Sequence, residues 1–317
     1  MSKYDALLIV SFGGPEKRED VIPFLENVLR GRNVPSERML AVAEHYYHFD
    51  GRSPINDQNR ALIEALRCEV KIPIYWGNRN WHPMLVDTMR QMQADGIKHA
   101  IAFVTSAFGS YSGCRQYIED IQRTRGELRI DKIRPFSANP KFIEAMTDRV
   151  RTALAELPHG RLVFTAHSVP QSMAASSPYV GELERASAAV ASAVGRDSWK
   201  LVYQSRSGPP TQPWMEPDIV DYLREIRSDV IIVPIGFLSD HMEVLYDLDT
   251  EARAVCEELG VKMVRAGTAG THPKMIEMIA EMVEQEHVAC PEGCCPAPQR
   301  QATPLAGKKI DPPVPPT

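Results

Sequence analysis

The sequence predicts an α/β protein built from two doubly wound domains, each a parallel sheet flanked by helices. Short apolar runs alternate with amphipathic stretches along the whole chain, which is typical of parallel strand–helix units. The two halves also share a plan. Segments 6–15 and 162–170 each run from an apolar strand into a loop ending in proline, and segments 100–113 and 230–243 each run strand, Phe, polar loop. Such a loose repeat is what two related domains leave.

The strands are predicted from continuous apolar runs at 6–10, 72–76, 99–104, 161–164, 201–203 and 230–233. Continuous rather than alternating apolar residues indicate strands that are buried on both faces. Amphipathic stretches predict helices at 20–30, 84–95, 216–227 and 273–287. Ligands of such folds bind beyond the carboxyl ends of the strands, so the loops there are the first place to look for a site.

The composition excludes several classes of function. The 317 residues carry 36 Lys and Arg against 41 Asp and Glu without basic clusters, so no nucleic acid is expected as a partner. No apolar run approaches the roughly 20 residues of a membrane span, and the first residues lack the features of a signal peptide, which predicts a cytoplasmic protein. The glycine motifs that bind dinucleotides or ATP are absent, so no nucleotide cofactor is expected.

The cysteines are unevenly spread. Three of the six crowd into six residues near the C-terminus: Cys290, Cys294 and Cys295. In a chain without an export signal, such crowding points to metal binding before disulfides. Cys68 and Cys256 fall on helical stretches and are expected to be small core residues. The prolines that follow predict a disordered tail over 297–317.

His167 directly follows a buried strand, in the stretch 164–170. A neutral imidazole at a strand end can accept a proton or ligate a metal near neutral pH. The alternative is a histidine that only hydrogen-bonds a neighbouring loop, and spacing alone favours that alternative.

Glu243 lies in the acidic stretch 239–249. Asp240 is a good N-cap residue, and a glutamate three residues later would complete a capping box, which is a purely structural role. The three carboxylates Glu243, Asp247 and Glu251 recur at intervals of four and so lie on one helix face. They form either a solvated surface row or a path for a cation, and the pattern alone favours the surface row.

A polar, proline-rich loop follows the strand that ends near Tyr203, and Trp214 comes shortly after it. Loops that hold aromatic residues often form the wall of a flat ligand site, although a tryptophan is by default a packing residue.

Together these segments resemble the signature stretches of the ferrochelatases, enzymes that insert ferrous iron into a porphyrin. The signature stretches are 164–170, 203–209 and 239–249, and the resemblance extends over nearly the whole chain through 8–15, 30–32, 51–56 and 76–80. It implies two Rossmann-like domains of the chelatase type with the active-site cleft between them. The implied division is 1–113 with a returning helix at 273–289, then 114–272, the cysteine segment 290–296 and the tail 297–317.

The resemblance implies that His167 and Glu243 are paired active-site residues on opposite sides of the porphyrin centre. Metallation removes two pyrrole protons while ferrous iron enters, so a histidine and a carboxylate can divide the roles of proton acceptor and iron ligand. Asp247 and Glu251 would then continue a metal or proton path. The sequence does not assign the two roles within the pair.

The N-terminal half looks most like the actinobacterial coproporphyrin III ferrochelatases, through 45–49, 53–56 and 110–117. This implies a tetra-carboxylate porphyrin as substrate and coprohaem as product, in haem biosynthesis. The residues expected to bind the porphyrin are Phe12, Arg30, Tyr46, Ser53, Tyr117, Tyr203 and Trp214. Phe12 departs from the pattern, since it stands where some bacterial members have an iron-contacting tyrosine.

Some ferrochelatases hold a 2Fe-2S cluster with one mid-chain cysteine and three near the C-terminus. By this resemblance the four thiolates would come from Cys114, Cys290, Cys294 and Cys295. Gly293 and Pro296 permit the bend that adjacent cysteines need. A zinc site and a reduced cysteine tail are the alternatives.

Three other functions stay open at this point. The first is a ferrochelatase that makes protohaem directly from protoporphyrin IX, and the second is a non-catalytic tetrapyrrole carrier, which would not require both His167 and Glu243. The third is a chelatase for cobalt or nickel, which the signature stretches favour less than iron. A downstream enzyme of the haem pathway is the expected protein partner.

Overall fold

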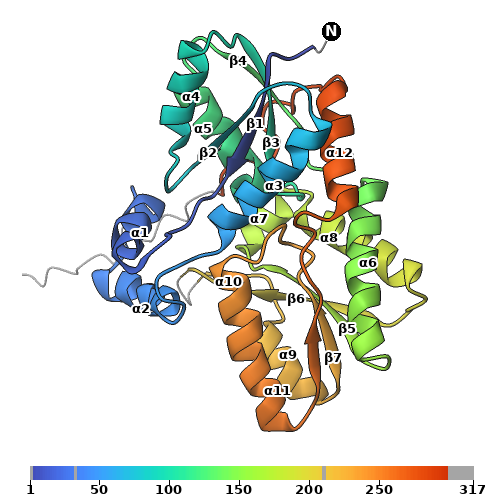
Figure 1. Cartoon of the computed structure of the whole chain (residues 1–317). Helices are drawn as coiled ribbons and strands as arrows, with labels where there is room; N and C mark the ends of the chain where they lie inside the picture. Colours follow the sequence, from blue (N-terminus) through green and yellow to red (C-terminus); the bar gives the residue numbers. More distant parts are fainter. Residues whose placement is uncertain (1–2, 32–33, 209–211, 299–317) are drawn as a thin grey trace, which may run out of the picture.

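The computed structural model describes residues 3–31, 34–208 and 212–298, and its strands form two parallel four-stranded sheets (Figure 1). The first sheet has the order β2-β1-β3-β4 and the second β6-β5-β7-β8. The strands are β1 (Ala6–Ser11), β2 (Ile74–Asn78), β3 (His99–Val104), β4 (Arg129–Lys132), β5 (Arg161–His167), β6 (Trp199–Gln204), β7 (Val230–Val233) and β8 (Met263–Arg265). The repeated order confirms the predicted pair of similar α/β halves.

The central strands are buried in the middle of each sheet because their sequences are apolar. All six residues of β1 are buried, and β1 pairs with β2 on one side and β3 on the other. The edge strands β4 and β8 were not predicted. The four residues of β4 read Arg-Ile-Asp-Lys and none of them is buried, so this strand lacks the continuous apolar run that marks the central ones.

Helices cover the faces of both sheets. They are α1 (Val21–Leu29), α2 (Ser36–Tyr47), α3 (Ile55–Glu69), α4 (Leu85–Ala94), α5 (Gln116–Thr124), α6 (Pro140–Glu156), α7 (Gln171–Ala175), α8 (Tyr179–Ala193), α9 (Ile219–Ile226), α10 (Met242–Val244), α11 (Arg253–Leu259) and α12 (Pro273–Glu284). A short 3-10 turn, η1 (Arg18–Asp20), precedes α1, and two π-helical segments, η2 (Tyr111–Arg115) and η3 (Leu245–Ala252), precede α5 and α11. None of the described helices is long and apolar enough to cross a bilayer.

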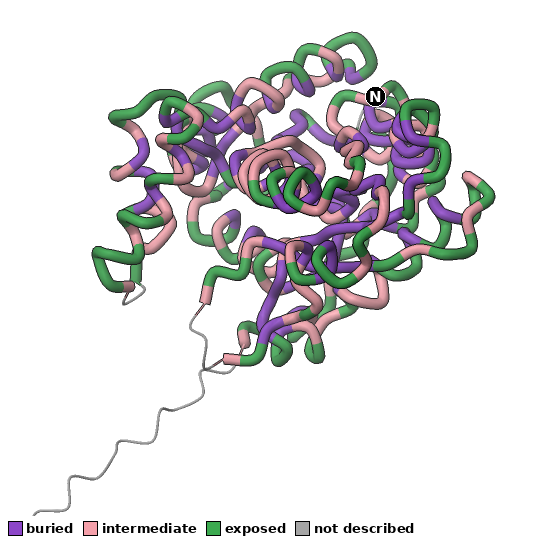
Figure 2. Tube along the Cα trace, turned by 90° about the horizontal axis from the view of Figure 1, so that it is seen from below, coloured by how far each residue is buried: buried purple, intermediate pink, exposed green. Residues whose placement is uncertain are grey.

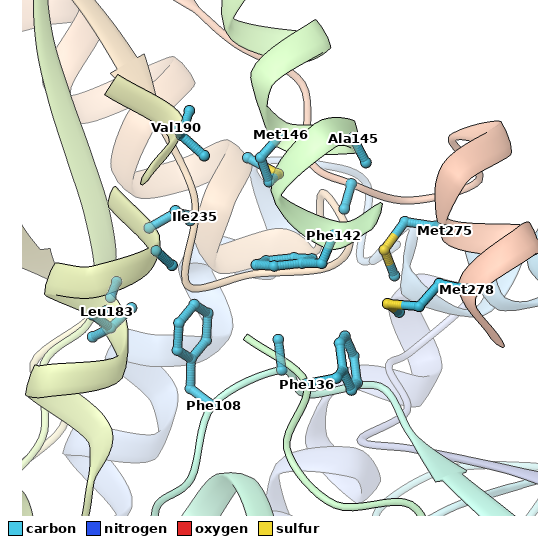
Figure 3. Packing of buried hydrophobic residues seen from close by; sticks show 14 of the residues in the cluster. Phe108, Phe136, Phe142, Ala145, Met146, Leu183, Val190, Ile235, Met275 and Met278 are labelled. Atoms are coloured by element: carbon cyan, nitrogen blue, oxygen red, sulfur yellow. The ribbon is translucent and has the colours of Figure 1, made fainter. Parts of the chain in front are cut away.

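The two halves share one continuous core (Figures 2 and 3). One buried apolar cluster contains residues of both sheets, such as Ile9 of β1 and Phe164 of β5. Helix α12 packs against both α3 and α6 (Figure 1), and its Met275 and Met278 face Phe142 of α6 across this cluster. The first sheet runs on through β4 to Lys132, past the predicted domain end at residue 113. The predicted tail lies outside the described residues from 299 onward.

Helices α1 and α2 pack together as a separate small unit beside the first sheet (Figure 1). Their own apolar cluster consists of Val21, Phe24, Leu25, Ala43 and Tyr46, together with Met242 from α10. A residue of the second half therefore completes the core of a unit from the first half. This contact brings α1 and α2 against the segment that contains Glu243.

Candidate active site

His167 and Glu243 face each other. His167 is the last residue of β5, and Glu243 lies in α10, which follows the loop after β7. The Nε2 atom of His167 is 3.9 Å from Oε2 of Glu243. The side chains are 31% and 41% exposed, so both are accessible to a ligand. The sequence prediction placed this pair in one site, and the fold brings the two residues together at strand ends, as parallel sheets do.

The tautomer of His167 follows from its hydrogen bond. Its Nδ1 lies 2.6 Å from the carbonyl oxygen of Ser168, and a carbonyl only accepts, so Nδ1 carries the proton. In the neutral imidazole the lone pair then sits on Nε2, the atom that faces Glu243. The hydroxyl of Tyr179 donates to the carbonyl of His167 at 3.0 Å and holds the strand end in place.

His241 is a third member of the site, which the sequence reasoning did not single out. Its Nδ1 lies 4.0 Å from Oε2 of Glu243, and its ring packs edge-on against Phe237 at 5.0 Å. Burial lowers the pKa of His241, although the charge of Glu243 opposes this effect. The imidazole is therefore neutral at pH 7. Its position two residues before Glu243 was the only signal in the sequence.

The capping box, the structural alternative for Glu243, does not form. The N-cap of α10 is His241, and no side chain accepts a hydrogen bond there. The carboxylate of Asp240 instead pairs with Nη1 of Arg265 at 2.7 Å. Glu243 consequently has no capping role, and its carboxylate faces His167.

The acidic row begins at Glu243 and continues along η3. Burial raises the pKa of Asp247 to about 7, and the charges of Glu243 and Glu251 add to the effect. The hydroxyl of Ser205 and the amide of Gln204, at 3.3 Å, donate hydrogen bonds to this carboxyl and hold it in place. Asp247 therefore changes protonation near neutral pH, which a solvated surface carboxylate does not do. Glu251 is exposed, and its pKa is also raised.

Two of the seven expected porphyrin contacts lie at the surface. Phe12 is 37% exposed and packs edge-on against Phe24 of α1. Arg30 is exposed at the end of α1, where its guanidinium donates to the side chain of Asn27. Both are therefore accessible to a ligand.

The other five expected contacts are buried. Tyr46 belongs to the α1–α2 cluster, and the hydroxyl of Ser53 accepts a hydrogen bond from the backbone N–H of Met242 at 3.3 Å. Tyr117 lies beneath Arg79, whose guanidinium is 4.6 Å from the ring centroid. The remaining two are Tyr203 and Trp214. These five side chains are therefore not exposed to a ligand in this structure.

The cysteines of the predicted cluster come from η2 and from the C-terminal segment. Burial raises the pKa of the Cys114 thiol in η2, Lys132 opposes this effect, and the thiols of Cys290 and Cys294 add to it. The Sγ atoms of Cys294 and Cys295 are 3.6 Å apart, and burial together with Cys294 raises the pKa of Cys295 to about 12. Gly293 provides the expected bend with a φ of +77°. Within the described residues, no group of three or more metal-binding side chains is arranged to hold an ion.

Arg115 ties this cysteine segment to the body of the protein. Its Nε donates to the carbonyl of Cys294 at 2.8 Å and its Nη2 to the carbonyl of Pro291 at 2.9 Å. Of the two cysteines expected in the core, Cys256 is buried as predicted. Cys68 is exposed, so that prediction is wrong. Cys68 lies in the last turn of α3, where the helix leaves the core.

Comparison with known proteins agrees with this architecture. The family model for ferrochelatase matches residues 4–287. The ferrochelatase of Rhodopirellula baltica is 50% identical over an alignment that covers 97% of each chain. The coproporphyrin III ferrochelatase of Streptomyces coelicolor is 45% identical over 93% of this chain and 94% of its own.

Solved structures extend the likeness to the fold. The structure titled SirB from Bacillus subtilis with Fe³⁺ superimposes with a TM-score of 0.54 at 13% identity, over 88% of this chain and 93% of that one. At such low identity only the chelatase fold is shared. The match to the family model and the long alignments at high identity go further, and they establish that the chain belongs to the ferrochelatase family.

Proposed function

We propose that this protein inserts ferrous iron into coproporphyrin III, forming coprohaem with release of two protons. The observation that carries the proposal is the pairing of His167 Nε2 with the carboxylate of Glu243 at 3.9 Å. Within the described residues, Nε2 of His167 and the carboxylate of Glu243 make no hydrogen bond, so both remain available to a substrate. A tetrapyrrole carrier would need no such pair.

The chemistry divides naturally between the two residues. Metallation replaces two pyrrole N–H protons by one Fe²⁺ ion, so the porphyrin core stays neutral and two protons must leave. The lone pair on Nε2 of His167 accepts a pyrrole proton, and the carboxylate of Glu243 attracts the incoming cation or takes up the second proton. Asp247, with a pKa of about 7, then passes protons or the cation between Glu243 and the surface end of the row at Glu251.

Coproporphyrin III is favoured over protoporphyrin IX by the names of the relatives. Proteins named coproporphyrin III ferrochelatase from Streptomyces, Nocardia and Frankia are 44–46% identical to this chain over most of its length. The extra carboxylates of coproporphyrin need cationic or polar partners, and exposed Arg30 is the residue that we assign to this task.

We further propose that Cys114, Cys290, Cys294 and Cys295 bind a 2Fe-2S cluster. Four cysteine thiolates are the donor set that such a cluster requires, and the mutual effects of these thiols on their pKa values indicate that they are neighbours. When bound, the cluster would tie the C-terminal segment to η2. Binding requires loss of the thiol protons.

Three wider expectations belong to the same proposal. The chain divides into two functional units, 1–113 with 273–289 and 114–272, and the pairing of β4 favours moving the boundary to follow Lys132. The reaction takes place in the cytoplasm. Its product passes to a downstream enzyme of the haem pathway.

A direct assay tests the substrate. Purified protein is supplied anaerobically with ferrous iron and either coproporphyrin III or protoporphyrin IX, and the change of the porphyrin absorption spectrum gives the initial rate. A higher kcat/KM for coproporphyrin III supports the proposal. Equal or reversed preference would overturn the choice of substrate, and no insertion into either would overturn the proposed function.

A further inference from the structure

One side chain holds both ends of the segment that contains Glu243. Arg265 is the last residue of β8. Its Nε donates to both carboxylate oxygens of Asp249, at 2.8 and 2.9 Å, and its Nη1 donates to Oδ1 of Asp240 at 2.7 Å. Glu243 and Asp247 stand between these two aspartates in the chain. The guanidinium thus links the two ends of the segment 240–249.

This ion-pair network is largely shielded from water. The side chains of Arg265, Asp240 and Asp249 are 15%, 27% and 25% exposed. Burial works to lower the pKa of Arg265, but the hydrogen bonds and charges of Asp249 and Asp240 leave it raised overall. Because the planar guanidinium holds its N–H donors in a fixed fork, it fixes the direction as well as the length of its hydrogen bonds to the two aspartates. A lysine at this position would supply the charge without the fork.

Other contacts also hold parts of this segment: Gln204 donates to the carbonyl of Glu243 at 3.4 Å and to the carboxyl of Asp247 at 3.3 Å, and Tyr246 stacks on His45. Helix α10 has only three residues and no side-chain cap, and it continues directly into the π-helical segment η3. On the side of the first sheet, the backbone N–H of Asp240 donates to Oε1 of Gln58 at 2.9 Å, and that of Met242 donates to Ser53. Those two bonds hold only the start of the segment. Among the described residues, Arg265 is the side chain whose ion pairs join Asp240 at the start of the segment to Asp249 in η3.

We infer that Arg265 is a positioning residue for metallation, which places the carboxylate of Glu243 opposite His167 by fixing Asp240 and Asp249. The inference rests on the proposed function, because it concerns the geometry of that same pair. Arg265 itself touches neither member of the pair. Its contribution therefore shows in the rate of the chemical step rather than in porphyrin binding, and a displacement of about 1 Å at a reacting group can cost roughly 100-fold in rate.

The test compares Arg265→Gln with a matched control, Arg224→Gln. Arg224 makes a two-bond ion pair with Glu258, at 2.9 Å for each bond, between α9 and α11 of the same half. For Arg265→Gln we expect kcat of iron insertion to fall about 10- to 100-fold, while KM and the dissociation constant for coproporphyrin III stay within about threefold. The control should keep the wild-type kcat. Arg265→Lys should lie between the wild type and Arg265→Gln.

Each outcome decides the inference. A folded Arg265→Gln variant with wild-type kcat, or an equal loss of kcat in Arg224→Gln, would overturn it. If Arg265→Gln fails to fold, Asp249→Asn takes its place, since it keeps the pair between Arg265 and Asp240 and should show the same split between kcat and KM. A wild-type protein that inserts no iron would instead overturn the proposed function, which separates the two failures.

Discussion

The ring of Tyr246 stacks flat on the ring of His45, with centroids 3.8 Å apart and planes within 10° of parallel. His45 lies on α2 and Tyr246 on η3, so the stack joins the α1–α2 unit to the helical segment that follows Glu243. Met242 inserts into the apolar cluster of the same unit. The two contacts hold α1 and α2 against the segment that contains Glu243.

Replacing the stacked Tyr246 should loosen the contact between the α1–α2 unit and the segment that contains Glu243. An aromatic pair contributes about 0.5–1.5 kcal/mol beyond its buried area, so Tyr246→Leu should weaken coproporphyrin III binding roughly two- to tenfold. Quenching of porphyrin fluorescence measures the dissociation constant. Leu40→Ala, at an exposed position of α2, serves as the control. Unchanged or tighter binding in Tyr246→Leu would show that the stack does not secure the bound state.

Asp247 should make stability depend on pH in an unusual direction. Its folded pKa of about 7 lies above the ordinary aspartate pKa of 3.8, so between these values the folded state binds more protons than the unfolded state. Its contribution to the free energy of unfolding therefore decreases as pH rises through this window, by at most about 1.4 kcal/mol per pH unit. Urea unfolding at pH 5, 6 and 7 measures it.

The variant Asp247→Asn cannot titrate, so it should lose less stability than the wild type between pH 5 and pH 7. Asp197→Asn, at an exposed aspartate, should follow the wild type. Parallel curves for the wild type and Asp247→Asn would show that this carboxyl does not titrate near neutral pH.

Arg115 should be needed for assembly of the cysteine segment. Arg115→Gln removes the two hydrogen bonds to the carbonyls of Pro291 and Cys294, so the three C-terminal thiols are no longer held beside Cys114. Iron and acid-labile sulfide per chain should fall well below the wild-type content, and Cys294→Ser should abolish the visible absorption. Cys68→Ser, at an exposed cysteine away from the segment, should keep both. A wild-type protein purified anaerobically without iron or colour would contradict the cluster itself.

The sequence predicted the apolar framework from local patterns, whereas the pairing of His167 with Glu243 was implied by the family resemblance. The runs at 6–10 and 230–233 are buried central strands, and the strand end at His167 lies beside Glu243. It failed where tertiary contacts override local preference. Asp240 reads as a helix cap, but Arg265, distant in the chain, binds its carboxylate. Short polar edge strands such as β4 form only because β3 provides a partner.

Burial of individual side chains was equally hard to predict. Tyr203 and Trp214 are aromatic residues near loops and were expected to contact the porphyrin, yet both are buried. Cys68 belongs to an amphipathic helix but lies on its exposed side. His241 was not predicted as a site residue, because the acidic pattern that begins at Glu243 was the more prominent feature of this stretch. The fold brings Nδ1 of His241 to 4.0 Å from Oε2 of Glu243.

The rate of ferrous iron insertion into coproporphyrin III by His167→Ala tests the central claim most directly. Loss of the proton acceptor should lower kcat by about 100-fold or more, while the porphyrin dissociation constant stays within about threefold of the wild type. Glu243→Gln should show the same pattern, since it leaves the size of the side chain unchanged and removes the charge. Wild-type kcat in His167→Ala would contradict the account, because the pair at the end of β5 would then not perform the metallation.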